Sequence, residues 1–166
     1  YEAGGNGPES GRHAIRFAPG TGELGMFQGA KSYLLENPEG QTLDTYSISA
    51  GLDYASVGPE HAWLKDIGRV NYSWATDQEA MSAFKDLCET EGIIPAIESS
   101  HAVAGAYKAA ADLKAKGYEH PVMIINISGR GDKDMNTAGK WFGYLTDEQA
   151  KALEANGAQG NNADGE

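Results

Sequence analysis

The sequence predicts an α/β fold, a parallel sheet with helices on both faces that is incomplete at the N-terminus. Short apolar segments alternate with helical patterns between residues 70 and 127, and turn signals separate them. Strands joined by helices form right-handed crossovers, which make neighbouring strands parallel. The chain starts without a methionine or a signal pattern, so we expect its N-terminus to be a cut edge.

The first elements are short. The first 30 residues are rich in glycine and keep no period of 2 or 3.6 residues, which predicts loops. Residues 31–36 are typical of a short strand or a helical turn, and Asn37–Gly40 is typical of a turn. Residues 70–74 alternate in part between apolar and polar side chains, which predicts a strand.

Two helices and two further strands follow. Thr76 and Glu79 have the spacing of a capping box, which predicts a helix over residues 77–91 that ends at Gly92. Residues 93–97 form an apolar run too short for a core helix, so we expect a strand. A second helix should begin at Ser99 or Ser100 and run to Lys116, and residues 121–127 should form the most deeply buried strand.

The chain divides at about residue 145. Residues 1–145 hold the patterns above, and residues 146–166 hold a polar helix over residues 147–155 followed by a tail of glycine, asparagine and acidic residues. Such a composition buries little apolar surface, so we expect the tail to be disordered.

Composition excludes several classes of protein. The 13 basic and 24 acidic residues give a formal net charge of −11, which disfavours nucleic acid and anionic membrane surfaces as partners. Cys88 is the single cysteine of the sequence, so no internal disulfide forms, and the cytoplasm is the expected compartment. Its helical spacing from Phe84 favours a buried structural thiol. No histidine or cysteine pair has zinc-site spacing.

Ligands of such sheets bind beyond the carboxyl ends of the strands, where two segments carry polar side chains. Residues 128–134, Ser-Gly-Arg-Gly-Asp-Lys-Asp, follow the last strand, and their glycines permit close backbone approach to a ligand. The alternative is a tight turn with a surface Arg–Asp pair. Glu98–His101 follows the strand over residues 93–97, and Glu98 and Ser99 either bind a ligand or only cap the helix.

A third segment, residues 47–61, is dominated by small residues that let the backbone approach a ligand. Asp53 is a candidate hydrogen-bond acceptor within it. The alternative is an ordinary connection into a helix near Glu60.

Three long stretches resemble the β chain of tryptophan synthase, in the same order: residues 47–61, 91–102 and 126–134. The resemblance extends over about residues 1–145, roughly the second half of the family's chain. It implies the C-terminal portion of a fold-type II enzyme that uses pyridoxal 5′-phosphate (PLP). It also implies a lyase that condenses L-serine with indole to L-tryptophan by β-replacement, the last step of this amino-acid biosynthesis.

The resemblance assigns site residues by position. Ser128 matches the serine that meets the pyridine nitrogen of PLP, Gly51 and Gly129 match positions around the cofactor, and Glu98 matches the acidic residue beside the ring. Asp53 matches the residue that contacts the substrate serine as the site closes. A neutral hydroxyl, unlike a carboxylate, does not keep the pyridine nitrogen protonated. The ring is then a weaker electron sink, which suits elimination and replacement better than transamination.

Further positions concern an ion and partners. The backbone carbonyls of Tyr54 and Ser56 match part of a site for a monovalent cation, sodium or potassium. Phe27 and Gln28 fall near positions that line a tunnel for indole, which comes from a partner α subunit. Gln28 replaces an aromatic or small apolar residue of other members. The family also forms a β–β homodimer.

The family's Schiff-base lysine, catalytic glutamate and glycine-rich phosphate loop match no part of this sequence, so we expect the chain alone to be inactive. Two other functions remain open. In the first, the chain is a non-catalytic half that completes an N-terminal half or binds an α subunit. In the second, weaker alternative, it belongs to a serine or threonine dehydratase of the same PLP class.

Overall fold

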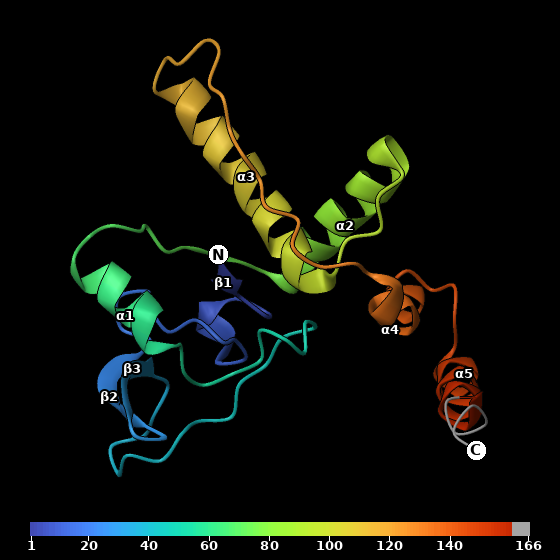
Figure 1. The fold of residues 1–166 in the computed structure, drawn as a ribbon, viewed down its shortest axis with the longest axis horizontal. Coiled ribbons are helices and arrows are strands. Elements are labelled where there is room, and N and C mark those ends of the chain that lie inside the picture. Colours follow the sequence, from blue (N-terminus) through green and yellow to red (C-terminus); the bar gives the residue numbers. More distant parts are fainter. Residues whose placement is uncertain (161–166) are drawn as a thin grey trace.

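The computed structural model describes residues 1–160 of the chain. Its strands are few and short. β1 (Glu2–Ala3) pairs in parallel with β4 (Trp74–Ala75), and β2 (Glu23–Phe27) pairs antiparallel with β3 (Ala30–Leu34). The helices are α1 (Pro59–Asp66), α2 (Asp77–Glu91), α3 (Ile97–Ala115), α4 (Met135–Trp141) and α5 (Asp147–Gly160), with 3₁₀ turns η1 (Pro8–Ser10) and η2 (Asp132–Asp134) (Figure 1).

The β2–β3 connection is a two-residue hairpin turn. Gln28 and Gly29 both have positive φ angles, 50° and 80°. Paired positive φ angles twist a tight turn in the direction that matches the twist of its strands. The segment over residues 31–36, for which strand and helical turn were both open, is therefore largely strand.

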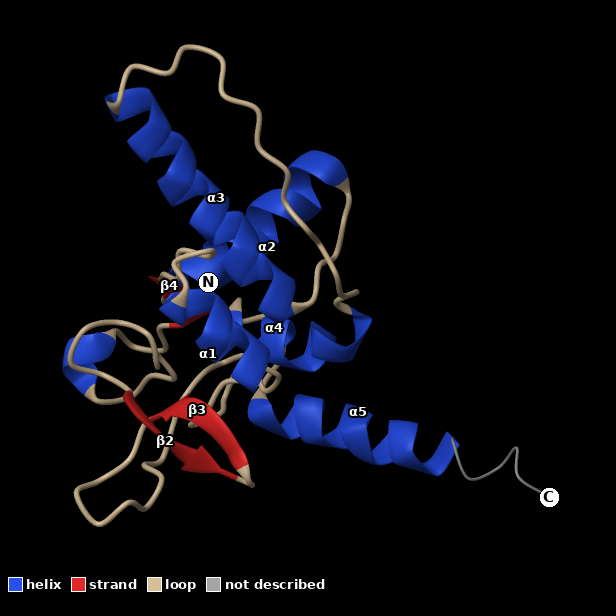
Figure 2. Cartoon of the chain, turned by 60° about the vertical axis from the view of Figure 1, so that its left-hand side comes forward, coloured by secondary structure: helices blue, strands red, loops and turns tan. Residues whose placement is uncertain are grey.

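Helices α2 and α3 form the centre of the described chain (Figure 2). The Thr76 side chain accepts from the backbone N–H of Glu79, and the Glu79 carboxylate accepts from the N–H of Thr76, as the predicted capping box requires. Gly92 ends α2 with a φ of 66°. Buried small side chains let the two helices approach closely: Ala75, Ala83, Val103 and Ala104 make one cluster.

A second cluster joins α4 to this centre. It contains Met81, Phe84, Ile97 and Ala138, with Cys88 half-buried against it. Cys88 therefore packs as an apolar side chain, and burial raises the pKa of its thiol.

The predicted sheet is only partly present. The chain is α/β with one small parallel sheet, but neither residues 93–97 nor residues 121–127 form a strand. Ile94 is exposed, and Pro95 makes only an isolated bridge to Arg130. A strand requires a continuous run of paired residues, and the glycine-rich turn over residues 128–134 pairs with residues 94–96 only at this one bridge. Helix α3 begins at Ile97, before both predicted capping positions, Ser99 and Ser100.

The strand prediction for residues 121–127 was therefore wrong in this structure. The segment returns along α3 in an extended but unpaired form, with Val122 94% and Ile124 96% exposed. Of the strand predicted over residues 70–74, only Trp74 is in β4. The prediction of helices on both faces of a sheet has no counterpart in the described residues.

The helix predicted over residues 147–155 is α5, which continues to Gly160. Residues 156–160 were predicted to belong to the disordered tail, and they are helical here. The remainder of that predicted tail, residues 161–166, lies outside the described residues.

Candidate functional site

The first turn of α3 is the point where the three motif segments meet. The backbone N–H of Gly51 donates to Glu98 Oε1 at 2.9 Å. Lys133 Nζ donates to Glu98 Oε2 at 2.9 Å. One carboxylate therefore joins the small-residue loop over residues 47–61 to the glycine-rich turn over residues 128–134.

A second set of contacts places the glycine-rich turn against the same helix end. The backbone N–H of Gly129 donates to Ser99 Oγ at 3.1 Å, and the hydroxyls of Ser99 and Ser128 are 3.5 Å apart. The carbonyl of Gly129 accepts from the N–H of Ala96 at 2.9 Å. The prediction that Ser99 caps the helix was wrong, because the N-cap residue of α3 is Ala96 and no side chain caps it. The Ser99 hydroxyl instead fixes the position of the turn that carries Ser128.

Glycine is required at two of these positions by close packing. A Cβ added to Gly51 would lie 2.5 Å from Glu98 Oε1, and a Cβ added to Gly129 would lie 2.8 Å from the Cβ of Ala96. Cβ atoms essentially never approach other atoms so closely. The two glycines identified in the sequence therefore permit the junction around Glu98.

The environment of Glu98 keeps its carboxylate ionised. Burial opposes ionisation, but hydrogen bonds from Lys133, from its own backbone N–H and from Gly51 outweigh this effect and lower the pKa to about 2. The hydroxyl of Ser49 lies near the same carboxylate without reaching hydrogen-bond geometry. Glu98 is therefore a fixed negative charge at neutral pH.

Lys133 belongs to this junction, although the sequence motifs did not single it out. Its ammonium group lies 2.8 Å from both carboxylate oxygens of Asp134 as well as 2.9 Å from Glu98. Burial alone would lower its pKa, but the hydrogen bonds and charges of Asp134 and Glu98 raise it. Asp134 is its neighbour in η2, whereas Glu98 comes from α3, so only the folded chain reveals the ion pair with Glu98.

Asp53 makes no hydrogen bond to the residues of this junction in the described part of the chain. Its Oδ1 atom is buried without a hydrogen-bond partner, and its charge contributes to raising the pKa of Asp77, although burial of Asp77 is the larger cause. Asp77 in turn accepts from the backbone N–H of Ile48 at 3.1 Å, which fixes the start of the same loop. The structure shows no contact of Asp53 with Glu98 or Ser128.

His101, at the end of the Glu98–His101 segment, is a packed histidine. Its Nδ1 lies 2.9 Å from the carbonyl of Ile97, and the ring is buried. Burial is the main cause that lowers its pKa.

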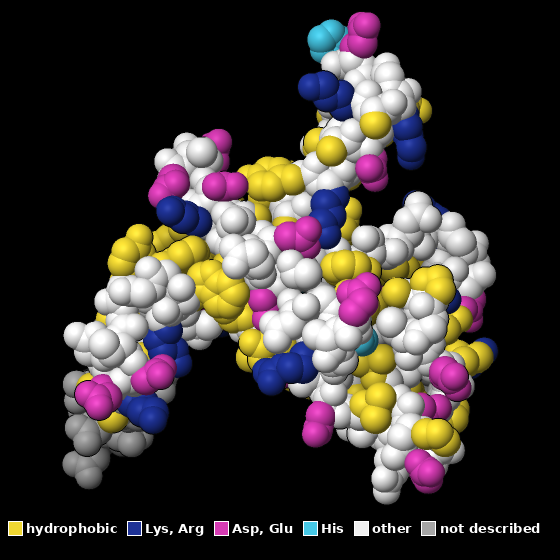
Figure 3. All heavy atoms as spheres, turned by 180° about the vertical axis from the view of Figure 1, so that it is seen from behind, with side chains coloured by type: hydrophobic (Ala, Val, Ile, Leu, Met, Phe, Trp, Pro, Cys, Tyr) yellow, Lys and Arg dark blue, Asp and Glu magenta, His cyan; other side chains and the backbone are white. Residues whose placement is uncertain are grey.

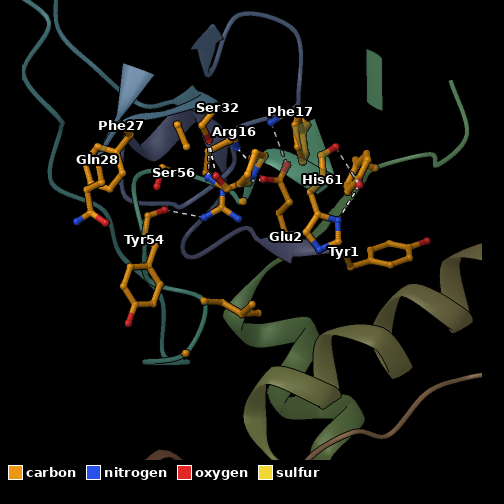
Figure 4. A pocket seen from close by; sticks show the side chains of 17 residues that line it. Tyr1, Glu2, Arg16, Phe17, Phe27, Gln28, Ser32, Tyr54, Ser56 and His61 are labelled. Carbon is orange, nitrogen blue, oxygen red and sulfur yellow. Dashed lines mark hydrogen bonds and ion pairs between the residues drawn. The ribbon is translucent and has the colours of Figure 1, made fainter. Parts of the chain in front are cut away.

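A cavity of about 720 Å³ is lined in part by the small-residue loop (Figure 4). Phe27 and Gln28 of the hairpin turn line it, together with Tyr54 and Ser56. The carbonyl of Tyr54 accepts a hydrogen bond from Arg16 Nη1 at 2.6 Å. The residues assigned to an ion site and to a tunnel thus share one cavity, which also contains a buried arginine.

The described residues contain neither a metal-binding cluster nor a membrane-spanning helix. Between residues 1 and 160, no group of three or more histidine, cysteine or acidic residues is arranged to hold a metal ion. Within the same range, no helix combines the length and apolar character needed to cross a membrane.

Comparison with known proteins gives close sequence relatives. Over 145 residues the chain is 59% identical to proteins named tryptophan synthase beta chain from Mycobacterium tuberculosis and Mycobacterium bovis, which covers 87% of this chain and 33% of theirs. A protein of the same name from Bordetella parapertussis is 51% identical over 142 residues, 86% of this chain and 34% of that protein. No family model matches the chain.

The chain spans about a third of the length of these curated relatives. This share is smaller than the half that the motifs suggested.

Proposed function

Because its 145 matched residues make this chain a member of the tryptophan synthase beta-chain family, we propose that it serves the PLP-dependent condensation of L-serine with indole to L-tryptophan. The observation that carries the proposal is the junction at Glu98. Three segments that resemble the family lie far apart in the sequence, and they meet at one carboxylate.

The residues at this junction fit the ring side of a PLP site in a fold-type II enzyme. The Ser128 hydroxyl is exposed, and its one contact is the 3.5 Å approach to Ser99, so it is available to the pyridine nitrogen. When bound, PLP supplies the electron sink for elimination and replacement at the β-carbon of serine. Glu98 provides a fixed negative charge beside the ring, and the close packing of Gly51 and Gly129 keeps backbone near it.

We assign to Asp53 the contact with the substrate serine. A buried carboxylate oxygen without a partner is costly, and Asp53 Oδ1 is such an atom. A substrate hydroxyl that donates to it would remove this cost.

The chain alone should not form the covalent bond to PLP. An imine-forming lysine must present a neutral amine, whereas Lys133 at the site is paired with two carboxylates that raise its pKa. The Schiff-base lysine, the catalytic glutamate and the phosphate-binding loop of the family would then come from sequence outside these 166 residues. Membership of the family also leads us to propose a cytoplasmic location, a β–β homodimer and a partner α subunit.

A second function is supported by the exposed apolar segment at Val122 and Ile124. Such a surface suits a non-catalytic half that completes an N-terminal half or binds an α subunit. A PLP-dependent serine or threonine dehydratase is the weaker alternative, since it would use the same cofactor site.

The test combines the chain with a polypeptide that supplies the family's remaining residues. With PLP, L-serine and indole, the pair should make tryptophan, and Ser128→Ala should reduce the rate while Ser82→Ala, at an exposed position of α2, should not. The chain alone should show no imine absorbance. Keto acid and ammonia formed equally with and without indole would indicate a dehydratase, and failure to co-purify or to restore activity would contradict complementation.

A further inference from the structure

Arg16 and Glu2 form a buried ion pair at the edge of the 720 Å³ cavity (Figure 4). Arg16 Nε lies 2.8 Å from Glu2 Oε1, and the side chains are 8% and 5% exposed. The Glu2 carboxylate also accepts from the backbone N–H groups of Arg16 and Phe17, at 2.9 and 3.0 Å. The carboxylate is thus bonded at both oxygens, and the guanidinium is held in one orientation.

The free end of the guanidinium points at the small-residue loop. Arg16 Nη1 donates to the carbonyl of Tyr54 at 2.6 Å. This carbonyl is one of the two that the family resemblance assigns to a monovalent cation, and Ser56, the other, lines the same cavity. A positively charged group of the protein therefore already binds at the position expected for the ion.

The donors present do not fit an additional alkali ion at Tyr54. The guanidinium stays protonated in proteins and cannot accept a metal. An ion that bound the Tyr54 carbonyl would lie within a few ångströms of the guanidinium, and the two positive charges would repel each other. Glu2, the nearest compensating charge, is already neutralised by Arg16.

We propose that the Arg16 guanidinium is the built-in cation of this loop and replaces the monovalent ion at the carbonyl of Tyr54. Arginine binds carbonyl and carboxylate oxygens with several donors in fixed geometry. It ties the loop that carries Asp53 to β1 and to the segment after it, which is a positioning role. The expectation of an ion at this position rests on the proposed function, whereas the hydrogen bonds of Arg16 are features of the structure itself.

The experiment is a series of thermal melts of the full protein that carries these residues, without PLP, serine or indole. The salts are sodium, potassium, caesium and tetramethylammonium chloride at one ionic strength. We expect the unsubstituted protein to melt at the same temperature in all four. Arg16→Met should melt roughly 2–4 °C higher in sodium or potassium than in tetramethylammonium, because a small ion then binds the vacated carbonyl.

Two further variants complete the series. Arg12→Met removes the same charge from a residue stacked on Tyr46 outside the cavity and should remain insensitive to the ion. Because loss of Arg16 alone leaves Glu2 buried and unpaired, the double variant Glu2→Gln/Arg16→Met provides a better-tolerated form. Sodium-23 NMR line widths of the unsubstituted protein should show no saturable binding.

Ion-specific stabilisation or saturable sodium binding in the unsubstituted protein would overturn the proposal. Equal melting of every variant in all four salts would also overturn it, because Arg16 would then not occupy an ion site. Neither outcome depends on tryptophan synthesis, so failure of this proposal is distinguishable from failure of the proposed function.

Discussion

At the scale of single residues, the state of Glu98 depends on contacts from three segments. Gly51 and Lys133 hold one carboxylate oxygen each, and α3 contributes its N-terminal backbone. The motifs indicated that Glu98 and Gly51 belong to a site. They did not indicate that Lys133 completes it, because that contact spans 35 residues and depends on the turn that Gly129 permits.

We expect Lys133→Met to raise the pKa of Glu98 from about 2 toward its ordinary value of 4.5, because the largest hydrogen-bond contribution is lost. Carboxyl carbon-13 NMR titration measures this pKa. Lys85→Met is the matched control, since Lys85 pairs only with the exposed Glu89, at 3.7 Å. An unchanged Glu98 pKa in Lys133→Met would contradict the assignment.

The lowered pKa of Glu98 also predicts how the stability of the fold changes at acidic pH. A carboxyl group whose pKa is lower in the folded than in the unfolded chain stabilises the fold above the unfolded pKa, and this contribution is lost as the pH falls through the folded pKa. For Glu98 the loss should therefore fall between about pH 4.5 and 2. Lys133→Met should remove much of it, as acid denaturation with and without the substitution would show.

At the scale of elements, α2 is the part of the fold that local sequence predicts best. Its start, its end and its buried face at Ala80 and Phe84 agree with the sequence pattern. Glu79 has a second task, because its carboxylate also accepts from Lys108 of α3 at 2.8 Å. The capping box therefore helps to join the two central helices.

We expect Thr76→Ala to lower the free energy of unfolding by about 1 kcal/mol, the usual cost of losing such a cap. Urea denaturation measures this value. Thr90→Ala is the control, because the exposed Thr90 hydroxyl bonds only to the carbonyl of Asp86 near the end of α2. Equal losses in the two variants would show that the cap has no special importance.

The strands could not be predicted in the same way. A capping box or a helix end is specified within a few residues, whereas a strand needs a partner that can lie anywhere in the chain. Residues 121–127 have the composition of a buried parallel strand, yet no described segment pairs with them. Composition thus shows that a segment can enter a sheet, but the neighbours decide whether it does.

At the scale of the whole molecule, helices α2 and α3 and α4 enclose small cores, while apolar side chains remain on the surface (Figure 3). Ile127 still packs against the α2–α3 cluster, but Val122 and Ile124 extend into solvent. An extended apolar segment with unpaired backbone is a template for association with another chain.

We therefore expect the isolated chain to self-associate with rising concentration and Val122→Thr/Ile124→Thr to reduce that association. Threonine keeps the branched Cβ that favours extended backbone, so the substitution mainly removes apolar surface. Sedimentation velocity measures the fraction of dimers and larger species. Ile67→Thr/Val70→Thr, at positions 53% and 37% exposed near the end of α1, is the matched control.

The two outcomes separate a local cause from a general one. If apolar exposure anywhere drove association, the control would reduce it as much as the variant at residues 122 and 124. If the unpaired segment drives it, only the variant at residues 122 and 124 reduces association, since these two side chains are nearly fully exposed on backbone that is in no sheet. A monodisperse, cooperatively melting unsubstituted chain would contradict the expectation and would show that the α2–α3 core is sufficient for a stable fold.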